Sequence, residues 1–291
     1  MIHVRLQGGL GNQMFQYALG RFLSKKFDVN LYLDISQYDQ NNEIRSYGLN
    51  HFNIKATHST FFNSFFYCLP VSGSSILSRL FRKLIKKKNQ NKIIINEKDF
   101  NFDPDILEIR KGYLIGNWQT EKYFFSIKNI LQEEFTLKTT LSPTALTIAE
   151  KIKSSVSTSL HIRRGDYAIE NKTNIKHGLC GLEYYQKATA LIIKKNPETV
   201  FYVFSDDIEW AKQNLSLSRE TIFVSHKNIP DYEELILMSL CKNNIIANST
   251  FSWWGAWLNR DKNKMVIAPQ RWFRDEEKDT PDIIPKSWIR L

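Results

Sequence analysis

The sequence is poor in cysteine and lacks a long apolar run. Its 291 residues contain three cysteines, which lie far apart and form no C-x-x-C pair. Their number and spacing exclude a disulfide scaffold and indicate buried thiols in a reducing cytosol. The longest uncharged stretch, residues 56–78, is interrupted by Pro70, Gly73 and many Ser, Thr and Asn residues, so it is too polar to cross a bilayer as a helix.

The N-terminal residues also lack the marks of a secretory signal. They offer no basic head, no apolar core and no cleavage site, so we expect a cytoplasmic protein. General disorder is excluded as well, because 42% hydrophobic and 13% aromatic residues are enough to bury a full core.

The chain carries excess positive charge, with 40 Lys and Arg against 30 Asp and Glu and a net charge of +10. This balance favours an anionic partner: nucleic acid, an acidic membrane surface or a phosphorylated small molecule. Within residues 76–88, six Lys and Arg alternate with apolar residues at helical spacing, which predicts a basic amphipathic helix. Such a helix either packs its apolar face on the core or docks on an anionic membrane surface or a lipid-linked acceptor.

Short apolar strands alternate with helices along the chain. The first half begins with a strand at 2–6, a glycine turn, a helix from about residue 12 and a strand at 29–33; a strand at 93–95, one at 113–115 and a helix at 121–134 follow. Ser142 and Pro143 then mark a helix start as N-cap and first-turn proline.

The second half repeats this alternation more regularly. We expect strands at 159–163, 200–204, 222–224, 245–247 and 266–268, and helices at 183–194, 207–214, 232–241 and 252–258. The pattern predicts an α/β protein of two doubly wound lobes facing a cleft. The lobes would be residues 1–140 and 141–291, and the last residues could pack back on the first lobe.

Polar side chains stand at three strand ends in the second half, where ligands of parallel sheets bind. The first group is the segment HIRRGDY at 161–167. Alternation along the strand puts His161 and Arg163 on one face. Either Arg163 or Arg164 suits a phosphate, with the other arginine held by Asp166. The alternative is an Arg–Asp pair that only fixes the turn.

The other two groups follow the strands at 200–204 and 245–247. Ser205, Asp206 and Asp207 suit a metal ion or the N–H groups of a guanine ring, unless Ser205 or Asp206 merely caps a helix. The segment from Asn248 places hydroxyl groups at a helix N-terminus, where free N–H groups and the dipole favour an anion. Its tryptophans are expected in the core.

Five segments together resemble a known family. They are GGLGNQMFQYALGR at 8–21, GNWQTEKYF at 116–124, HIRRGDY at 161–167, FSDDIEWAK at 204–212 and NSTFSWWGAWL at 248–258. Their sequences and order resemble the bacterial α-1,2-fucosyltransferases of glycosyltransferase family 11. The resemblance implies a GT-B fold that transfers L-fucose from GDP-fucose to the 2-hydroxyl of a terminal galactose, with inversion and without a metal or other cofactor.

The resemblance also implies roles for individual residues. The C-terminal lobe would bind the donor and the N-terminal lobe would offer much of the acceptor site. Arg163 and Asn12 would be catalytic. The donor-binding residues would be Gly9, Gly11, His161, Arg164, Asp166, Ser205, Asp206, Asp207, Ser249, Thr250 and Ser252. Independently of the resemblance, we expect Asp34, Trp118, Gln119 and His177 on the acceptor side.

The group that takes the acceptor proton stays open at this point. Candidates are Asp34, Glu43, Glu170 and His177, and the departing phosphate oxygen could also serve. The acceptor would be a galactose-terminated oligosaccharide, free or lipid-linked. A membrane-bound acceptor or docking through residues 76–88 would place the protein at the inner face of the bacterial cytoplasmic membrane.

Three other functions are compatible with parts of the pattern. A fucosyltransferase with another linkage or acceptor would share these motifs. A nicotinamide oxidoreductase would show βαβ units, but GGLGNQ does not have the G-x-G-x-x-G spacing. A basic nucleic-acid or membrane module would explain the charge, but not the polar groups at three strand ends, so no nucleic-acid partner is expected.

Overall fold

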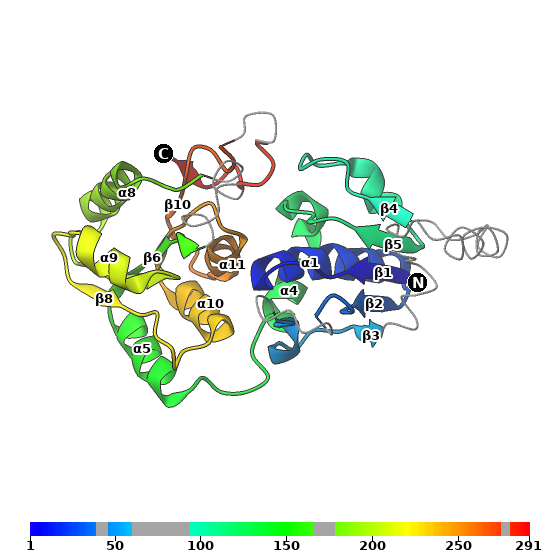
Figure 1. Ribbon diagram of the computed structural model, residues 1–291, viewed down its shortest axis with the longest axis horizontal. Coiled ribbons are helices and arrows are strands. Elements are labelled where there is room, and N and C mark those ends of the chain that lie inside the picture. The colour runs from blue at the N-terminus through cyan, green and yellow to red at the C-terminus, as the bar shows by residue number, and fades with distance from the viewer. Residues whose placement is uncertain (39–45, 60–93, 166–177, 275–279) are drawn as a thin grey trace, which may run out of the picture.

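Two parallel sheets lie side by side in the computed structural model, which describes residues 1–38, 46–59, 94–165, 178–274 and 280–291 (Figure 1). The first sheet has the order β3-β2-β1-β5-β4 and the second the order β11-β10-β9-β6-β7-β8. We call the first sheet with its helices the N-terminal lobe, and the second sheet with its helices the C-terminal lobe. All pairings within both sheets are parallel.

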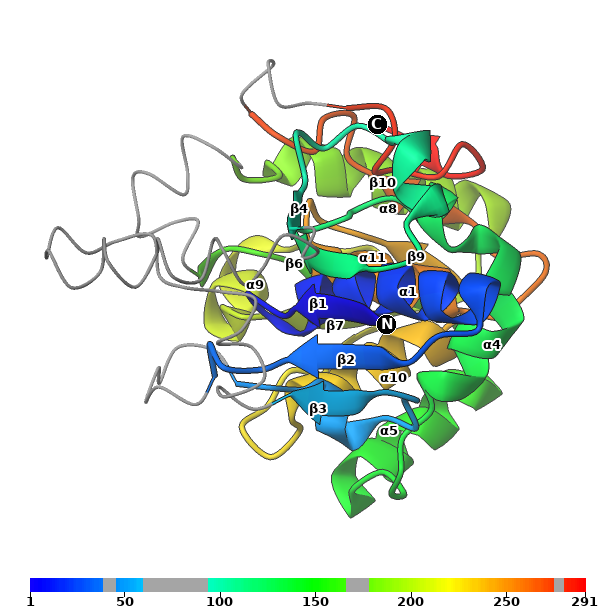
Figure 2. The same ribbon diagram turned by 90° about the vertical axis from the view of Figure 1, so that its right-hand side faces the viewer.

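The strands follow the apolar runs of the sequence. Those of the N-terminal lobe are β1 Ile2–Arg5, β2 Leu31–Asp34, β3 Thr57–Ser59, β4 Ile94–Asn96 and β5 Gly112–Ile115. Those of the C-terminal lobe are β6 Val156–Ile162, β7 Thr199–Ser205, β8 Thr221–Phe223, β9 Asn243–Ile245, β10 Val266–Ala268 and β11 Ile289–Arg290. Figure 2 shows the N-terminal sheet from outside, with α1 behind its strands.

The helices connect and cover these sheets. The α-helices are α1 Leu10–Phe27, α4 Lys128–Glu134, α5 Pro143–Ser154, α8 Leu182–Lys195, α9 Ile208–Asn214, α10 Asp231–Leu240 and α11 Thr250–Leu258. Short 3₁₀ turns are η1 Leu49–His51, η2 Pro104–Glu108, η3 Glu121–Tyr123 and η4 Phe125–Ile127. The predicted start of α5 is confirmed, since the Ser142 hydroxyl accepts a hydrogen bond from the Ala145 amide.

The helix expected at residues 121–134 is not continuous in the structure. The segment 121–134 was predicted as a single helix, but the structure divides it into η3, η4 and α4. The break is at Phe124, whose φ of −140° is not helical. Its fully buried ring stacks on Trp254 at 5.4 Å between centroids, so tertiary packing overrides the local helical pattern.

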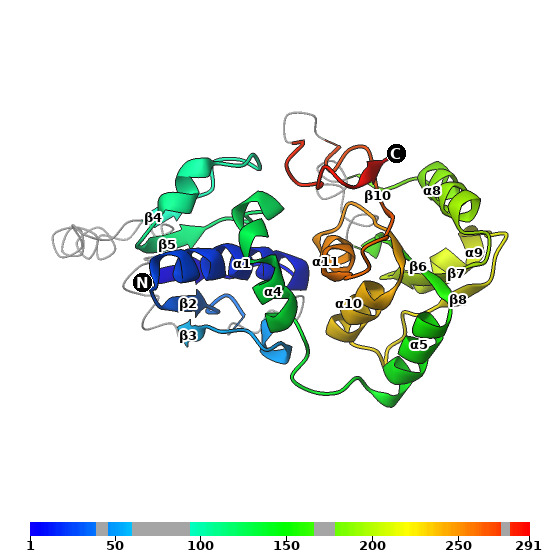
Figure 3. The same cartoon turned by 180° about the vertical axis from the view of Figure 1, so that it is seen from behind.

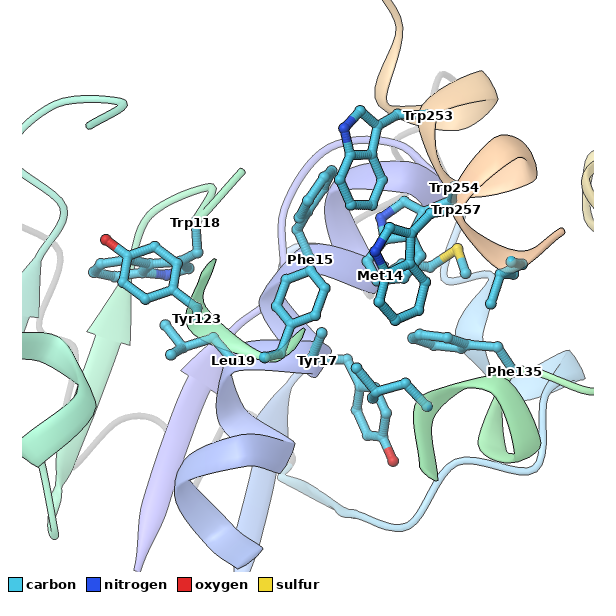
Figure 4. Packing of buried hydrophobic residues seen from close by; sticks show 14 of the residues in the cluster. Met14, Phe15, Tyr17, Leu19, Trp118, Tyr123, Phe135, Trp253, Trp254 and Trp257 are labelled. Carbon is cyan, nitrogen blue, oxygen red and sulfur yellow. The ribbon is translucent and has the colours of Figure 1, made fainter. Parts of the chain in front are cut away.

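The two lobes share one apolar core. The Phe15 ring on α1 lies 4.5 Å from Trp253 and 5.0 Å from Trp254 of α11, between ring centroids. Figure 4 shows these rings packed together, with Phe135 at their edge. The expectation that these tryptophans are core residues is confirmed, because Trp253, Trp254 and Trp257 are at most 2% exposed. This packing fixes α1 against α11.

The C-terminal segment is bonded to both lobes. The Trp253 indole donates to the Ile283 carbonyl at 2.8 Å, and the Asp282 carboxylate accepts from the Phe102 amide at 2.8 Å. Figure 3 shows the connection from α4 to α5 crossing between the lobes on the other side of the molecule. The lobes therefore touch along several chain segments.

In the described part of the chain, no helix is long and apolar enough to span a membrane. The basic stretch 76–88 lies outside the described residues. The boundary near residue 140 falls between α4 and α5 and stays a prediction.

Candidate functional site

A cavity of about 650 Å³ lies where the two lobes meet. It faces the carboxyl ends of β1, β6, β7 and β9, as the rule for parallel sheets predicts. The N-terminal lobe lines it with Gly8, Gly9, Leu10, Gly11, Asn12, Ser46 and Gln119. The C-terminal lobe lines it with His161, Arg163, Ser205, Asp206, Ile229, Asp231, Glu234, Asn248, Ser249, Thr250, Phe251 and Trp272.

Two helix N-termini meet at this cavity. The first turns of α1 and α11 both line it, one from each lobe. They approach closely because Gly11 has no side chain: a Cβ there would lie 2.5 Å from the Thr250 carbonyl carbon. The positive ends of both helix dipoles therefore act on the same space, which favours a bound anion.

Asn12 joins the two lobes at this crossing. Its Oδ1 accepts hydrogen bonds from the Gln119 amide at 3.1 Å and from the Thr250 hydroxyl at 3.0 Å. Because Asn12 Oδ1 holds Thr250 and Gln119 together, it fixes the relative position of the α1 and α11 N-termini.

Arg163 brings a positive charge to the cavity wall just after β6. Its Nη1 lies 2.8 Å from Asp206 Oδ2, and the other oxygen of Asp206 accepts from the Arg164 amide at 2.8 Å. The sequence had assigned this holding role to Asp166, which lies outside the described residues. Asp206 thus orients the turn after β6, and Gly165 fits there because a Cβ would meet the Asp206 carboxylate at 2.4 Å.

Arg164 points elsewhere. Its guanidinium stacks on the Trp210 ring at 3.8 Å from the centroid, and its Nε lies 3.5 Å from Asp207 Oδ2. Asp207 caps α9 by accepting from the Trp210 amide at 3.2 Å. Neither Arg164 nor Asp207 lines the cavity, so the helix-cap alternative holds for this part of the motif, with Asp207 rather than Ser205 or Asp206 as the capping residue.

His161 is the most strongly shifted base in the cavity. Burial, followed by the charge of Arg163, lowers the pKa of its imidazole to about 3. His161 is 4% exposed, and its Nδ1 has no hydrogen-bond partner among the described residues. A neutral imidazole offers one donor and one acceptor, so His161 can provide a hydrogen bond to a ligand without adding charge.

Two of the three hydroxyl residues at the start of α11 line the cavity, and the third is packed inside the protein. Ser249 and Thr250 line the cavity, and Ser249 stands at the N-cap position without a side-chain cap bond. Ser252 does not line the cavity, since it is 1% exposed and its hydroxyl donates to the Ser249 carbonyl at 3.3 Å. Ser205 lines the cavity while its hydroxyl accepts from the Asp207 amide at 3.0 Å.

The expected acceptor-side residues are only partly brought together. Gln119 lines the cavity, but Asp34 and Trp118 do not. Asp34 is 1% exposed and is held by the Tyr113 hydroxyl and the Ser36 amide, so it serves the sheet edge. Trp118 is 1% exposed and packs beside Tyr123, apart from the tryptophans of α11 (Figure 4).

Trp118 has an unusual backbone for a tryptophan, with a φ of +56°. The Glu97 carboxylate holds this turn by accepting from the Asn117 and Trp118 amides, each at 2.7 Å. The conspicuous NW pair of the sequence is therefore a structural turn that positions Gln119. The remaining candidates, Glu43, Glu170 and His177, lie outside the described residues.

Two carboxylates of the cavity were not anticipated from the sequence, Asp231 and Glu234 in the first turn of α10. Burial is the main cause that raises the pKa of Glu234 to about 7, and the charges of Asp231 and Asp206 add to it. No motif marked them, because acidic residues in the first turn are typical of any surface helix. Among the described residues, no three His, Cys, Asp or Glu side chains converge in a way that could hold a metal ion.

The sequence is similar over its whole length to glycosyltransferases of Escherichia coli. An Escherichia coli alpha-1,2-colitosyltransferase is 36% identical over 100% of this chain and 99% of its own. The O-antigen biosynthesis glycosyltransferase WbnK of Escherichia coli is 34% identical over 98% of this chain and 99% of its own.

The fold agrees as well. The solved structure of an Arabidopsis thaliana FUT1 mutant in complex with GDP matches 99% of this chain and 75% of that one, with a TM-score of 0.52 and 12% sequence identity. This likeness confirms the expected GT-B fold. The profile of glycosyl transferase family 11 matches residues 1–291. The chain therefore belongs to glycosyl transferase family 11.

Proposed function

We propose that the protein transfers L-fucose from GDP-fucose to the 2-hydroxyl of a terminal galactose, with inversion and without a metal. The observation that carries this proposal is the meeting of two helix N-termini and Arg163 at one cavity between the lobes. The family, the motif resemblance and the similarity to an alpha-1,2-colitosyltransferase support the linkage. The GDP complex of the structural neighbour supports the nucleotide.

The phosphates of the donor fit the junction of α1 and α11. Ser249 and Thr250 have small side chains, so a phosphate can approach the free amides of the first turn of α11. Arg163 lines the same cavity with a guanidinium that can bind phosphate oxygens at two points. A bound diphosphate would compete with Asp206 for this guanidinium, and we propose that the ion pair between them gives way when the donor binds.

The leaving group determines what the site must supply. As the bond from the sugar to the diphosphate breaks, the sugar becomes oxocarbenium-like and negative charge grows on the β-phosphate. We propose that Arg163 and the α11 amides stabilise that charge, and one such fixed donor is typically worth ~3–4 kcal/mol. Asn12 holds the two helix ends in register, which keeps these donors aligned.

The acceptor would enter from the N-terminal lobe, where Gln119 and Ser46 line the cavity. We infer that Asp34 is not the base, because it is buried at the sheet edge and bonded to Tyr113. We infer that the acceptor proton goes to the departing phosphate or to a group among the residues outside the described ranges.

A second donor is favoured by one specific observation. The 36% identical relative is named as a colitosyltransferase, and colitose is the 3-deoxy analogue of L-fucose. Both sugars would present the same reacting carbon and the same 6-methyl group to this cavity. GDP-colitose is therefore the alternative donor, with the same linkage.

Transfer to lactose tests the proposal directly. The purified protein is given GDP-fucose or GDP-colitose in parallel, with EDTA present, and the product mass and linkage are determined. We expect an α-1,2-linked product whose formation does not depend on metal. GDP release without a linked product would support the GDP-sugar donor and contradict lactose as an acceptor. A protein that does not interact with GDP would contradict the proposed donor.

A further inference from the structure

We propose that Gln13 is a positioning residue for the acceptor: its buried amide holds the segment 46–48 so that the Ser46 hydroxyl meets the galactoside. This inference rests on the proposed transfer to a galactoside, and it names the part of the N-terminal lobe that binds this sugar. Gln13 ends the GGLGNQ segment of the sequence, and it does not itself line the cavity.

The Gln13 side chain is fully buried and fully hydrogen-bonded. It stands in the first turn of α1 and is 0% exposed. Its Nε2 donates to the Gly8 carbonyl at 3.1 Å and to the Ser46 carbonyl at 2.9 Å. Its Oε1 accepts from the Gly48 amide at 2.9 Å. A carboxamide has two donor hydrogens and one acceptor oxygen, so every polar group of this side chain is in use.

This amide joins two segments that both line the cavity, at Gly8 and at Ser46. The two segments depend on it to different degrees. The Gly8 carbonyl has a second donor, the Tyr38 hydroxyl at 2.8 Å. Within the described residues, the hydrogen bonds that join the segment 46–48 to α1 both come from Gln13. Loss of the amide should therefore displace Ser46 more than it displaces the glycine turn.

The Ser46 side chain suits a neutral sugar. The described N-terminal lobe places three polar side chains on the cavity, those of Asn12, Ser46 and Gln119. Asn12 and Gln119 are bonded to each other at the contact between the lobes. Ser46 is exposed, which leaves its hydroxyl accessible to a ligand. A serine hydroxyl can both donate and accept, as the hydroxyl groups of a galactoside also do, so the two are complementary without a charge.

The Gln13→Glu variant keeps the length of the side chain but removes both donor hydrogens. Its carboxylate can still accept from the Gly48 amide, yet it would face the Gly8 and Ser46 carbonyls with nothing to donate. We expect the KM for lactose, measured at saturating GDP-fucose, to rise at least about tenfold, since each neutral hydrogen bond lost is worth about two- to tenfold in an equilibrium constant.

The same variant should keep its kcat and its affinity for GDP within about threefold, because a residue that acts on acceptor binding alone changes KM and not kcat. Asn12 and Arg163 are unchanged in it and keep their contacts at the phosphate side. Calorimetry on the full chain measures the affinity for GDP. This split between the KM for lactose and the other two quantities separates a positioning role from a general loss of structure.

Asn259→Asp is the matched control. The Asn259 amide is buried, donates to the Cys241 carbonyl at 2.7 Å and to Asn244 Oδ1 at 2.8 Å, and accepts from the Asp261 amide at 2.8 Å. It stands at the C-terminal end of α11 and does not line the cavity. Both amide-to-acid variants should lower the Tm, and only Gln13→Glu should raise the KM for lactose.

Ser46→Ala tests the contact with the sugar without disturbing the core. We expect it to raise the KM for lactose about three- to tenfold, the range of one neutral hydrogen bond, at an unchanged Tm and GDP affinity. If Gln13→Glu does not fold, Gln13→Met removes the same bonds without adding a charge.

Several results would overturn the proposal. These are an unchanged KM for lactose in the Gln13 variant or in Ser46→Ala, and an equal rise of that KM in Asn259→Asp. A loss of GDP affinity as large as the rise in KM would also overturn it, since Gln13 would then serve the glycine turn. These outcomes, with an active wild-type protein, refute this inference alone. A wild-type protein that transfers nothing to lactose would refute the proposed acceptor, and this inference with it.

Discussion

At the scale of single residues, the cavity depends on Arg163. Its guanidinium combines with the α11 amides to favour a diphosphate, and Asp206 orients it in the structure described here. We expect Arg163→Ala to reduce kcat by at least about a hundredfold, because a fixed donor to the leaving phosphate is typically worth ~3–4 kcal/mol. Steady-state transfer assays measure this loss.

The control for Arg163→Ala is Arg219→Ala, whose side chain bonds the carbonyls of Pro197 and Ser218 at the surface. That variant should keep wild-type turnover. Both proteins should show the circular dichroism of the folded state. Transfer by Arg163→Ala at close to the wild-type rate would refute the role of this arginine.

His161 predicts a pH dependence of stability. Burial lowers the pKa of its imidazole from an ordinary 6.5 to about 3. Between pH 3 and pH 6.5 the unfolded state therefore binds a proton at this residue, whereas the folded state does not. The free energy of unfolding should therefore fall as the pH drops from 6.5 toward 3. Denaturant titrations should show a smaller fall in His161→Gln, and equal slopes in both proteins would contradict the burial of a neutral imidazole.

Individual residues also show where sequence reasoning succeeds and fails. His161, Arg163 and Ser249 were found because polar groups at strand ends of parallel sheets point to a ligand. Glu234 could not be found this way, since its position depends on how α10 packs beside β7 and β8. Asp34 satisfied the strand-end rule, yet a bond from Tyr113 fixes it inside the sheet edge.

At the scale of elements, the crossing of α1 and α11 sets the geometry of the site. Gly11 allows it, because any Cβ would lie 2.5 Å from Thr250 backbone, which cannot move aside as a side chain can. We expect Gly11→Ala to lower the free energy of unfolding by roughly 1–3 kcal/mol through overpacking and to weaken transfer by separating the helix ends.

Gly181→Ala is the matched control for this crossing. Gly181 precedes α8 with a φ of −72°, and a Cβ there would meet nothing within 4 Å. Thermal unfolding should distinguish the two variants, with a lower Tm only for Gly11→Ala. Equal Tm values would mean that α1 and α11 do not need their close approach.

Most helices and strands follow from apolar periodicity and caps, as Ser142 at the start of α5 illustrates. The exceptions have tertiary causes. Phe124 interrupts the helical pattern of 121–134 because its ring enters the shared core against Trp254. The short edge strand β3 escaped prediction because Thr57–Ser59 carries no apolar run and is held by parallel pairing with β2.

At the scale of the whole molecule, the shared core argues against independent lobes. Phe15, Phe124 and Phe135 of the N-terminal lobe pack on the tryptophans of α11, so separating the lobes would expose them to water. We expect a single cooperative unfolding transition, coincident by far-ultraviolet and near-ultraviolet circular dichroism. Two resolved transitions would contradict this interpretation.

Trp254 lies at the centre of that shared core, and its side chain is fully buried. We expect Trp254→Ala to lower the free energy of unfolding by about 3–5 kcal/mol, because a large cavity would open between the lobes. Leu146→Ala, at an exposed position on α5, should change it little. Denaturant unfolding of both variants gives the comparison.

The central claim is that the cavity between the lobes holds a GDP-sugar across the two helix N-termini. A crystal structure of the protein grown with GDP tests it most directly. We predict the β-phosphate within hydrogen-bond distance of the first α11 amides and of Arg163. GDP bound with its phosphates away from α11 and Arg163 would contradict this account.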